Sequence, residues 1–557
     1  MKKNIAILSI LVFIFSADSC KKKPVTPIVI PPKKMSVISI LLNNTDWGSN
    51  TVYGTNRLPV IKISFSESVK QSTVAAAMKL TDAGGIPSAL FVTFENKDSV
   101  VVIQPSSQLS ALSRYQFIID GTLKSAAGGD YISSVNNLFI TQIDSSRKFP
   151  VISDNALLDL VQQQTFKYFW DFGHPVSGLA RERSNGDNEV VTSGGSGFGI
   201  MAIPAAINRN FITRAEGLAR LQKIIDFIKT KPPRFHGAFS HWMNGTTGAV
   251  VPFSAIDNGA DIVETSYLIM GLLTARQYFN GVDAAETTLR NDINAIWNAV
   301  EWDWFRQNGK KVLYWNWSPS NGWAVNVPVQ GWNECLITYV LAASSTTHGI
   351  TKAVYDSGFA RNGAMVNNNT YNGYKLPLGP AYGGPLFFSH YSFLGINPNG
   401  LNDVYADYTV QTKNHTLINY TYCINNQYAN YGYSDSCWGL TASDINNGYT
   451  ASSPTNDVSV IAPTAAISSL PYTPNESMKA LKFFYYVLGD KLWKQYGFVD
   501  AFSLKQLWYA NSFLAIDQGP IIVMIENHRS ALLWNLFTSC PEVKDGMRLL
   551  GFTAPYL

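Results

Sequence analysis

The chain has 557 residues, of which 46% are hydrophobic and 15% charged. At roughly 100–200 residues per domain, this length predicts about two to four domains, and the composition excludes a disordered or collagen-like chain. Residues 1–34 hold seven of the 43 basic residues and one of the 39 acidic residues, so the rest of the chain is nearly neutral. A nearly neutral body argues against nucleic acid as a partner.

The first twenty residues have the pattern of an export signal. A basic start, Met1–Asn4, precedes the apolar run Ile5–Phe15, which is too short to span a bilayer, so residues 1–19 predict a signal peptide. Cys20 follows small residues and resembles a bacterial lipoprotein processing site, with ordinary signal cleavage as the alternative. We therefore expect an exported lipoprotein held to a membrane by lipid on Cys20. The basic flank Lys21–Lys23 favours periplasmic over surface display.

A tether and a small β domain should follow. Residues 20–36 are rich in Lys and Pro, which predicts an extended tether. Residues 37–145 contain short β-type runs separated by turn residues, which predicts an all-β sandwich. The expected strands are Val37–Leu42, Leu58–Phe65, Ala89–Phe94, Ser99–Gln104 and Tyr115–Ile119. The string Ile61–Val69, with the turn at Gly128–Gly129, resembles bacterial Ig-like modules.

From residue 150 to 557 the hydrophobic periodicity becomes helical. Thr213 and Glu216 form a capping box, and Thr473, Pro474 and Glu476 repeat the same helix-start pattern. Helices are expected at 155–172, 213–230, 261–280, 284–305, 331–345, 402–426, 459–469, 475–487 and 517–538. Long loops rich in Gly, Pro, Asn and Trp separate them. This pattern predicts an all-α toroid of helical hairpins, with the loops forming a cleft at one end.

Three carboxylates stand at spacings of four and three residues: Asp257, Asp261 and Glu264. On one helix they would share a face. Clustered carboxylates move one another's pKa values apart, which separates the roles of acid and base. The alternative is that they are helix-start acids stabilised by the helix dipole.

Two further acids stand alone in apolar surroundings. Glu334 lies beside Trp332 and ahead of an apolar run, where a carboxyl tends to stay protonated, as a general acid requires. Asp517 precedes the apolar run Ile521–Ile525 at an expected helix start. A surface or helix-start acid is the alternative for Glu334, and a helix N-cap for Asp517. Glu526, inside the same helix as Asp517, is expected to be a buried structural acid.

Several other motifs indicate sugar binding or exclude other chemistries. Aromatic residues in the loop 313–323 suggest a sugar platform, unless they anchor the loop on the core, and Arg181–Arg183 suit hydroxyl groups or carboxylates. There is no GxSxG, CxxC or HExxH motif, so we expect neither a serine hydrolase nor a metal site, and no cofactor. Gly194–Gly197 only loosely resembles a phosphate loop because no Lys follows. Cys423 and Cys437 either pair or remain buried thiols.

The segment from Asn155 to Leu557 closely resembles glycoside hydrolase family 144, the glucoamylase-like proteins. The resemblance rests on Thr165–Trp170, Ser177–Arg183, Gly194–Met201, Ser240–Trp242, Asp257–Tyr267, Gly331–Tyr339, Leu376–Gly379, Gly383–Leu394, Cys437–Asp444, Ala462–Ala466 and Ala515–Asn527. It implies an (α/α)6 toroid that cleaves β-1,2-glucan or its oligosaccharides with inversion, releasing sophorose or short oligosaccharides. Starch is not the expected substrate.

The resemblance also implies functional residues. Glu334 is the expected general acid, and Asp517 is favoured as the base, with Asp261 next. Asp257 and Glu264 would bind sugar or orient water. The expected substrate-binding residues are Arg181, Arg183, His241, Trp242, Trp315, Trp317, Trp323, Trp332, His390 and Tyr391. We expect a monomer.

Three alternatives remain open. Related domains in cyclic β-1,2-glucan synthases transfer linkages, so this chain could be a transglycosylase. A glycan-binding lipoprotein without turnover is a second alternative. A polysaccharide lyase is a third, although the nearly neutral body disfavours the acidic substrate that a lyase needs. The sequence leaves open whether cleavage is endo or exo.

Overall fold

The computed structural model describes residues 31–557 and divides into two compact units, one ending at Thr141 and the other spanning Gln142–Leu557. The division lies a few residues before the expected end of the β domain at residue 145. The predicted signal peptide, Cys20 and most of the tether lie outside the described residues. Within 31–557, no helix combines the length and the apolar character needed to cross a bilayer.

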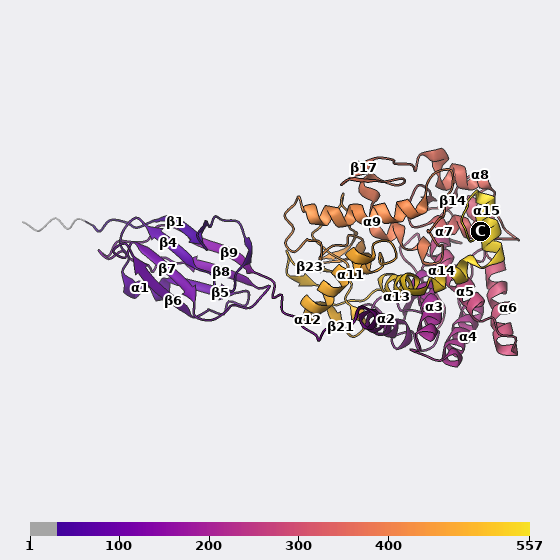
Figure 1. Ribbon diagram of the computed structural model, residues 1–557, viewed down its shortest axis with the longest axis horizontal. Helices are drawn as coiled ribbons and strands as arrows, with labels where there is room; N and C mark the ends of the chain where they lie inside the picture. The colour runs from indigo at the N-terminus through magenta and orange to yellow at the C-terminus, as the bar shows by residue number, and fades with distance from the viewer. Residues whose placement is uncertain (1–30) are drawn as a thin grey trace, which may run out of the picture. The chain divides into compact units, whose positions relative to one another are not determined.

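The first unit is the predicted β-sandwich (Figure 1). One antiparallel sheet contains, in order, β2 (Thr45–Asp46), β1 (Val37–Leu42), β4 (Ile61–Phe65), β7 (Val100–Pro105) and β6 (Leu90–Glu95). The other contains β3 (Val52–Thr55), β9 (Val135–Thr141), β8 (Arg114–Ile119) and β5 (Met78–Asp82), and the short helix α1 (Gln71–Ala77) precedes β5. β3 pairs with β9 in parallel, whereas the other pairs are antiparallel.

The core of the sandwich follows from the two-residue period of its strands. In β4, Ile61, Ile63 and Phe65 are buried, while the residues between them are partly exposed. Trp47 stacks on Phe117 between the sheets. Met35 is also fully buried in this core, so the β unit begins inside the segment 20–36 that was expected to be tether.

The second unit is mainly helical, and buried helices alternate with partly exposed ones along the chain. The buried helices are α3 (Ser193–Asn208), α5 (Ile262–Tyr278), α7 (Leu336–Ser344), α10 (Pro463–Ile467) and α13 (Ala515–Ser530). The partly exposed helices are α2 (Asp154–Trp170), α4 (Arg214–Thr230), α6 (Ala284–Asn298), α9 (Tyr408–Asn425), α11 (Pro474–Lys482) and α15 (Pro541–Leu550). Helices α3, α5 and α13 pack together in the middle of the unit (Figure 1).

Shorter elements fill the connections. The short helices are α8 (Lys352–Val354), α12 (Gly489–Leu492) and α14 (Leu532–Thr538). The short strands are β10 (Val190–Thr192), β11 (Trp242–Asn244), β12 (Val250–Val251), β13 (Ala260–Asp261), β14 (Leu313–Tyr314), β15 (Asn316–Trp317), β16 (Pro328–Val329), β17 (Thr370–Tyr371), β18 (Tyr374–Lys375), β19 (Ala442–Ile445), β20 (Gly448–Ala451), β21 (Trp493–Lys494), β22 (Gly497–Phe498), β23 (Phe502–Ser503) and β24 (Trp508–Tyr509). They form small hairpins and a three-stranded sheet, β10-β11-β12.

The glycine-rich segment that loosely resembles a phosphate loop is helix α3, which the sequence pattern did not predict. A side chain at Gly197 would collide with the backbone of Tyr267 on α5, and one at Gly271 on α5 would collide with the backbone of Gly197. The glycines therefore allow α3 and α5 to approach closely. The packing gained at this contact outweighs the low helix propensity of glycine.

The amino-terminal ends of the buried helices meet at one end of the unit. At the start of α3, Gly194 donates its backbone N–H to Glu264 in the first turn of α5. A side chain at Gly195 would collide with Ala515, the first residue of α13. At the start of α10, Thr464 donates to the backbone oxygen of Asp517 in α13. Helix starts carry partial positive charge, so this end of the fold favours carboxylates.

Several helix boundaries differ from the predicted ones for local reasons. The capping box of Thr213 and Glu216 is present, but Thr473 makes no side-chain cap although α11 begins at Pro474 as expected. The helix expected over 517–538 is broken at Ala531, which adopts left-handed backbone angles. The helix expected from residue 331 begins at Leu336, which leaves Glu334 in an irregular segment.

Glu526 is the buried structural acid that the sequence predicted. It is fully buried in α13 and accepts two hydrogen bonds from Arg209, at 2.7 and 2.9 Å, and others from Gln162, Asn208 and Ser530. Burial opposes its ionisation, but Arg209 and Ser530 outweigh burial and lower the pKa of Glu526.

We expect Glu526→Gln to lower the free energy of unfolding by about 3 kcal/mol, because it leaves Arg209 without its charged partner. Urea denaturation of this variant and of Asp545→Asn, an exposed acid paired only with Arg548, measures the difference. The control should change stability by less than about 0.5 kcal/mol. An equally small effect at Glu526 would contradict the structural role.

Candidate active site

Three of the predicted acids lie around His241, and a fourth lies beside two of them. Asp261 caps α5 by accepting from the backbone N–H groups of Val263 and Glu264, and its second oxygen contacts His241 Nδ1 at 3.0 Å. Only Glu264 belongs to the helix itself. Asp257 lies in the preceding loop, where it accepts from Asn316 at 3.1 Å. The expected single helical face is therefore wrong, although the three acids do come together.

The environment separates the protonation states in this group. Desolvation and the charge of Asp261 raise the pKa of Asp257 to about 6. Desolvation raises the pKa of the buried Glu264. Burial disfavours a charged His241, but Glu264 and Asp261 outweigh it and raise the pKa of His241 to about 9. At neutral pH the imidazolium of His241 therefore neutralises part of the negative charge of the acids.

Glu334 completes the group just before α7. Its backbone oxygen accepts from Tyr267 and Ser392, which fixes the irregular segment against α5 and the short helix Ser392–Leu394. The residue is partly accessible. Desolvation, with the charges of Glu264 and Asp261, raises the pKa of Glu334 to about 7. Glu334 is thus a partly accessible residue whose carboxyl group is about half protonated at neutral pH, far more than an ordinary glutamate.

Asp517 belongs to a second group, with two acids that sequence reasoning missed. Asp444, Asp500 and Asp517 are each less than 10% exposed. Asp500 accepts from the backbone N–H of Asp444 at 2.7 Å and forms a side-chain hydrogen bond with Asp517. Arg183 donates to Asp444 at 2.9 Å and also contacts Glu182. Desolvation and Asp500 raise the pKa of Asp517 well above its usual range.

One tyrosine lies between the two groups of acids, and another lies beside the second group. Tyr391 is buried, and both Asp517 and Glu334 contribute to raising its pKa after desolvation. Tyr449 lies opposite Asp444 in the β19–β20 hairpin and is 49% exposed. Desolvation and the charges of Asp517 and Asp500 nevertheless raise its pKa well above its usual range. Tyr449 is thus a partly exposed aromatic residue beside the second group of acids, and sequence reasoning also missed it.

Aromatic residues surround the first group of acids. The ring of His241 lies 4.6 Å from that of Phe253, which is 52% exposed, and Trp242 lies 4.8 Å from Phe253. Strand β15 pairs with β13, so Trp317 lies opposite Ala260, next to Asp261.

The remaining aromatics of this region are joined by the loop 313–323 that the sequence singled out. Trp317 and Trp323 both contact Trp304, and the backbone oxygen of Trp315 accepts from Ile262 at 3.0 Å. The loop thus lies beside the acids, which fits the predicted platform.

Three predicted substrate-binding residues have structural roles instead. Trp332 is 4% exposed and packs against Phe393 and Tyr408. His390 is 2% exposed, contacts Ser469 at 3.0 Å, and burial lowers its pKa to about 3. Arg181 donates its guanidinium N–H groups to the backbone oxygens of Phe172 and Asn188. The sequence shows each residue's type but not the direction of its side chain.

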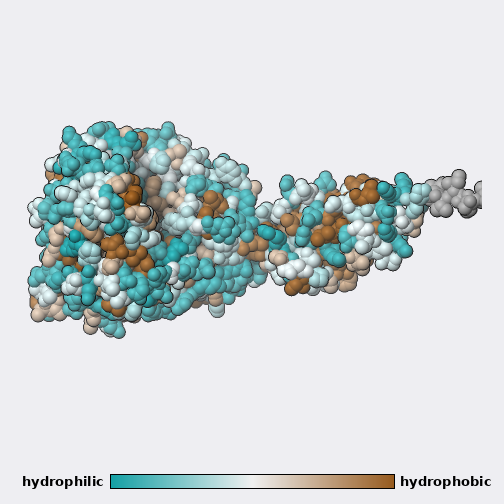
Figure 2. All heavy atoms as spheres, turned by 180° about the vertical axis from the view of Figure 1, so that it is seen from behind, coloured by the Kyte–Doolittle hydropathy of each residue, from teal (hydrophilic) through white to brown (hydrophobic). Residues whose placement is uncertain are grey.

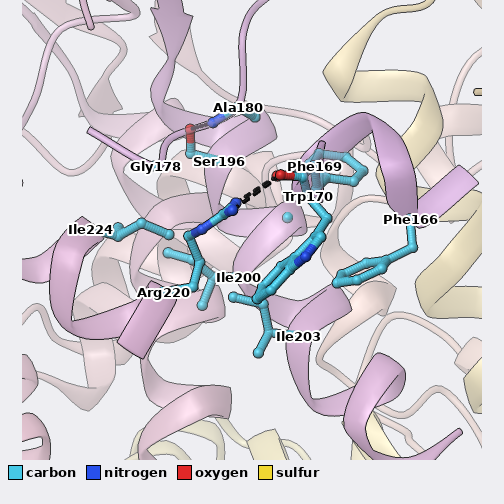
Figure 3. A pocket seen from close by; sticks show the side chains of 11 residues that line it. Phe166, Phe169, Trp170, Gly178, Ala180, Ser196, Ile200, Ile203, Arg220 and Ile224 are labelled. Carbon is cyan, nitrogen blue, oxygen red and sulfur yellow. Dashed lines mark hydrogen bonds between the residues drawn. The ribbon is translucent and has the colours of Figure 1, made fainter. Parts of the chain in front are cut away.

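The surface of the helical unit is hollowed on one face and carries hydrophobic patches beside the hollow (Figure 2). Another cavity, between α2, α3 and α4, measures about 10 Å³ and is too small for a sugar. Its wall includes Arg220, which donates to the backbone oxygen of Phe169 and lies over the ring of Trp170 (Figure 3).

Within residues 31–557, the site contains neither a disulfide nor a group of side chains arranged to hold a metal ion. Cys335, Cys423, Cys437 and Cys540 are all buried free thiols, so Cys423 and Cys437 do not pair in the structure. Across residues 31–557, no group of three or more His, Cys, Asp or Glu side chains is arranged to hold a metal ion.

Comparison with known proteins defines the class. A model described as putative glucoamylase matches residues 326–541, and a bacterial Ig-like domain model matches residues 44–141. An endo-β-1,2-glucanase from Chitinophaga pinensis, solved with sophorotriose and glucose, is 51% identical, with a TM-score of 0.72 over 73% of this chain and 100% of that one. The chain is therefore a glucoamylase-like glycoside hydrolase with an Ig-like domain. It belongs to glycoside hydrolase family 144.

Two other relatives come from Parabacteroides distasonis. A β-1,2-glucanase structure is 38% identical, with a TM-score of 0.70 over 94% of this chain and 74% of that one. A curated exo β-1,2-glucooligosaccharide sophorohydrolase acting from the non-reducing end is 46% identical over 429 residues. That match covers 73% of this chain but only 59% of the length of the sophorohydrolase.

Proposed function

We propose that the protein hydrolyses β-1,2-glucan or β-1,2-gluco-oligosaccharides with inversion, releasing sophorose or short oligosaccharides. The observation that carries this proposal is Glu334, a partly accessible residue whose carboxyl pKa of about 7 suits a general acid. The names of the relatives from Chitinophaga pinensis and Parabacteroides distasonis supply the substrate.

The proposed mechanism assigns one role to each group of acids. Glu334 protonates the glycosidic oxygen, and Asp517, from the second group, accepts a proton from the attacking water. In an inverting hydrolase these two groups lie on opposite sides of the scissile bond with water between them. Asp261 orients His241, while Asp257 and Glu264 contribute charge and sugar contacts. Arg183, Trp242, Trp317 and Trp323 line the proposed substrate cleft, and the buried Tyr391 lies between the two groups of acids.

The proposed architecture of the catalytic domain is an (α/α)6 toroid. The alternation of buried and partly exposed helices supports it, because in a toroid the outer ring of helices covers the inner ring and buries it. The buried segment Leu386–Leu394, between α8 and α9, would supply the sixth inner position with two short helical turns. The meeting of inner helix starts near the acids is what a toroid with its active site at one end requires.

The pKa of Glu334 predicts how the rate depends on pH. A general acid works only when protonated, so kcat/KM should fall as the pH rises through about 7. Initial rates on linear β-1,2-glucan between pH 4 and 10 measure this limb. If kcat/KM already fell with rising pH below pH 5, where an ordinary exposed glutamate loses its proton, the role of Glu334 would be contradicted.

We also propose that the protein is exported by residues 1–19 and anchored through lipid on Cys20, facing the periplasm, and that it acts as a monomer. The apolar run Ile5–Phe15 and the Cys that follows small residues support this location. Metabolic labelling with a fatty acid, in wild type and in Cys20→Ala, tests it. Lipid label that persists in Cys20→Ala would contradict the anchor.

A product assay separates the proposed activity from its alternatives. The full-length protein is incubated with linear β-1,2-glucan, β-1,3-glucan, β-1,4-glucan and starch, and reducing ends and product sizes are followed. Hydrolysis of β-1,2-glucan alone is expected: sophorose from the start indicates exo action, and a ladder indicates endo action. Longer or cyclic products would indicate transglycosylation. Binding of the glucan without new reducing ends would indicate a capture protein, and an unsaturated product a lyase.

A further inference from the structure

The contact between Asp500 and Asp517 is a second carboxyl pair inside the proposed active site. Both side chains are 2% exposed and are joined by a hydrogen bond. Two carboxylates cannot hydrogen bond without a proton between them, so one of the two must hold it. The pair therefore holds one proton and one negative charge, shared between the two carboxyl groups.

Each carboxyl of the pair also has one oxygen that no other group satisfies. Apart from the contact within the pair, Asp500 Oδ1 and Asp517 Oδ2 are buried and have no hydrogen-bond partner among the described residues. A buried carboxylate oxygen left without a partner is costly. A proton shared between the two carboxyl groups offsets this cost on both residues.

The surroundings hold Asp500 in place. Its Oδ2 accepts the backbone N–H of Asp444, whose own carboxyl is held by Arg183 and by Ser512. The other charged or titratable groups facing the pair are Glu182, on the strand segment beside α13, Tyr449 on β20, and Tyr391 next to the short helix Ser392–Leu394. Arg183 is the cation among them, so the cluster carries net negative charge once Asp500 is ionised.

We propose that Asp500 is the positioning residue of the general base, and that Asp500 and Asp517 act as one proton-sharing pair. This inference rests on the proposed hydrolysis. The pair begins with one proton and one negative charge. As water oxygen bonds to the anomeric carbon, one water proton passes to the pair, Glu334 gives its proton to the departing glycosidic oxygen, and the carbon–oxygen bond breaks. The pair ends neutral and returns one proton to solvent.

Sharing a proton gives the pair a basicity suited to its task. A lone aspartate is a weak base near neutral pH, because its pKa is about 3.9. Desolvation and Asp444 raise the pKa of Asp500 to about 7. A base that titrates near the working pH is the more efficient proton acceptor. The role of Asp500 is thus to form, with Asp517, a pair that accepts a proton near the working pH, without itself touching the sugar.

The test compares the pH dependence of kcat and of KM for wild type, Asp500→Asn and Asp500→Glu on β-1,2-glucan. Asparagine donates a hydrogen bond to an ionised Asp517 and removes the neighbouring charge. On the acidic side of the profile, kcat falls as the base becomes protonated. We expect this acidic limb to move down by at least about one pH unit. We also expect kcat at pH 7 to fall at least about 10-fold. KM should stay within about two-fold, because the pair contacts water rather than sugar. Asp500→Glu should restore the limb.

Two further samples keep the result decisive. Asp490→Asn, which changes an exposed acid in the first turn of α12, should behave as wild type. If Asp500→Asn does not fold, Asp444→Asn replaces it, because removing that charge should move the acidic limb in the same direction. An unmoved limb in the folded variant, or a rise in KM with kcat unchanged, would overturn the inference. A wild type without activity on β-1,2-glucan would instead overturn the proposed function.

Discussion

Glu334→Gln should reduce kcat on β-1,2-glucan by at least about 100-fold while leaving the fold and glucan binding intact, since general acid catalysis contributes roughly 10²–10⁴-fold. Glutamine matches the shape of the carboxyl but cannot give a proton to the glycosidic oxygen. The backbone contacts from Tyr267 and Ser392 that fix this segment do not involve the side chain, so they survive the substitution.

A substrate that needs no protonation isolates this role. In an aryl β-sophoroside made with a strongly acidic phenol, the phenolate departs without being protonated. Glu334→Gln should therefore lose far less activity on this substrate than on β-1,2-glucan. The matched control is Glu95→Gln, an exposed acid of the β unit paired only with Lys62. Equal losses on both substrates would show that Glu334 binds sugar or supports the fold rather than donating a proton.

Asp517→Asn should produce a loss of similar size, at least about 100-fold in kcat, but with the opposite chemical signature. This variant lacks the acceptor for the proton of water. Azide carries negative charge and needs no base, so millimolar to molar azide should restore turnover and yield a glycosyl azide of inverted configuration. Glu334→Gln should not respond to azide on the glucan, because its leaving group still lacks a proton.

The control for this experiment is Asp545→Asn, an exposed acid on α15. It should match wild type with and without azide. If Asp517→Asn kept wild-type activity, the base would be another acid, with Asp261 the next candidate. If Asp517→Asn were inactive and azide restored nothing, Asp517 would be structural.

The sequence predicted the helices and strands whose hydrophobic period is strong, and it failed where tertiary contacts override local preference. Strand β1 and helix α4 match their predicted ranges closely because a run of β-type residues and a capping box mark them. Helix α3 was missed because its glycines disfavour a helix, and only the close approach to α5 explains them. The break at Ala531 has no signal in the residue type.

The acids were found individually, and their arrangement was not. Asp261, Glu264 and Glu334 stand near helix starts that the sequence could locate, so their assembly was foreseeable from a helical toroid. Asp500 and Asp444 lie on irregular segments and short hairpins, which bring them to Asp517 across long stretches of chain. One signal was available: Asp500 is a lone acid inside the apolar run Phe498–Phe502.

The most direct test of the account follows the hydrolysis of linear β-1,2-glucan by proton nuclear magnetic resonance from the first turnovers. We predict new reducing ends in the α configuration, which mutarotate later to the β form. This result requires water attack opposite the leaving group, with Glu334 and Asp517 on opposite sides of the bond. New reducing ends that appear first in the β configuration, or none at all, would contradict the account.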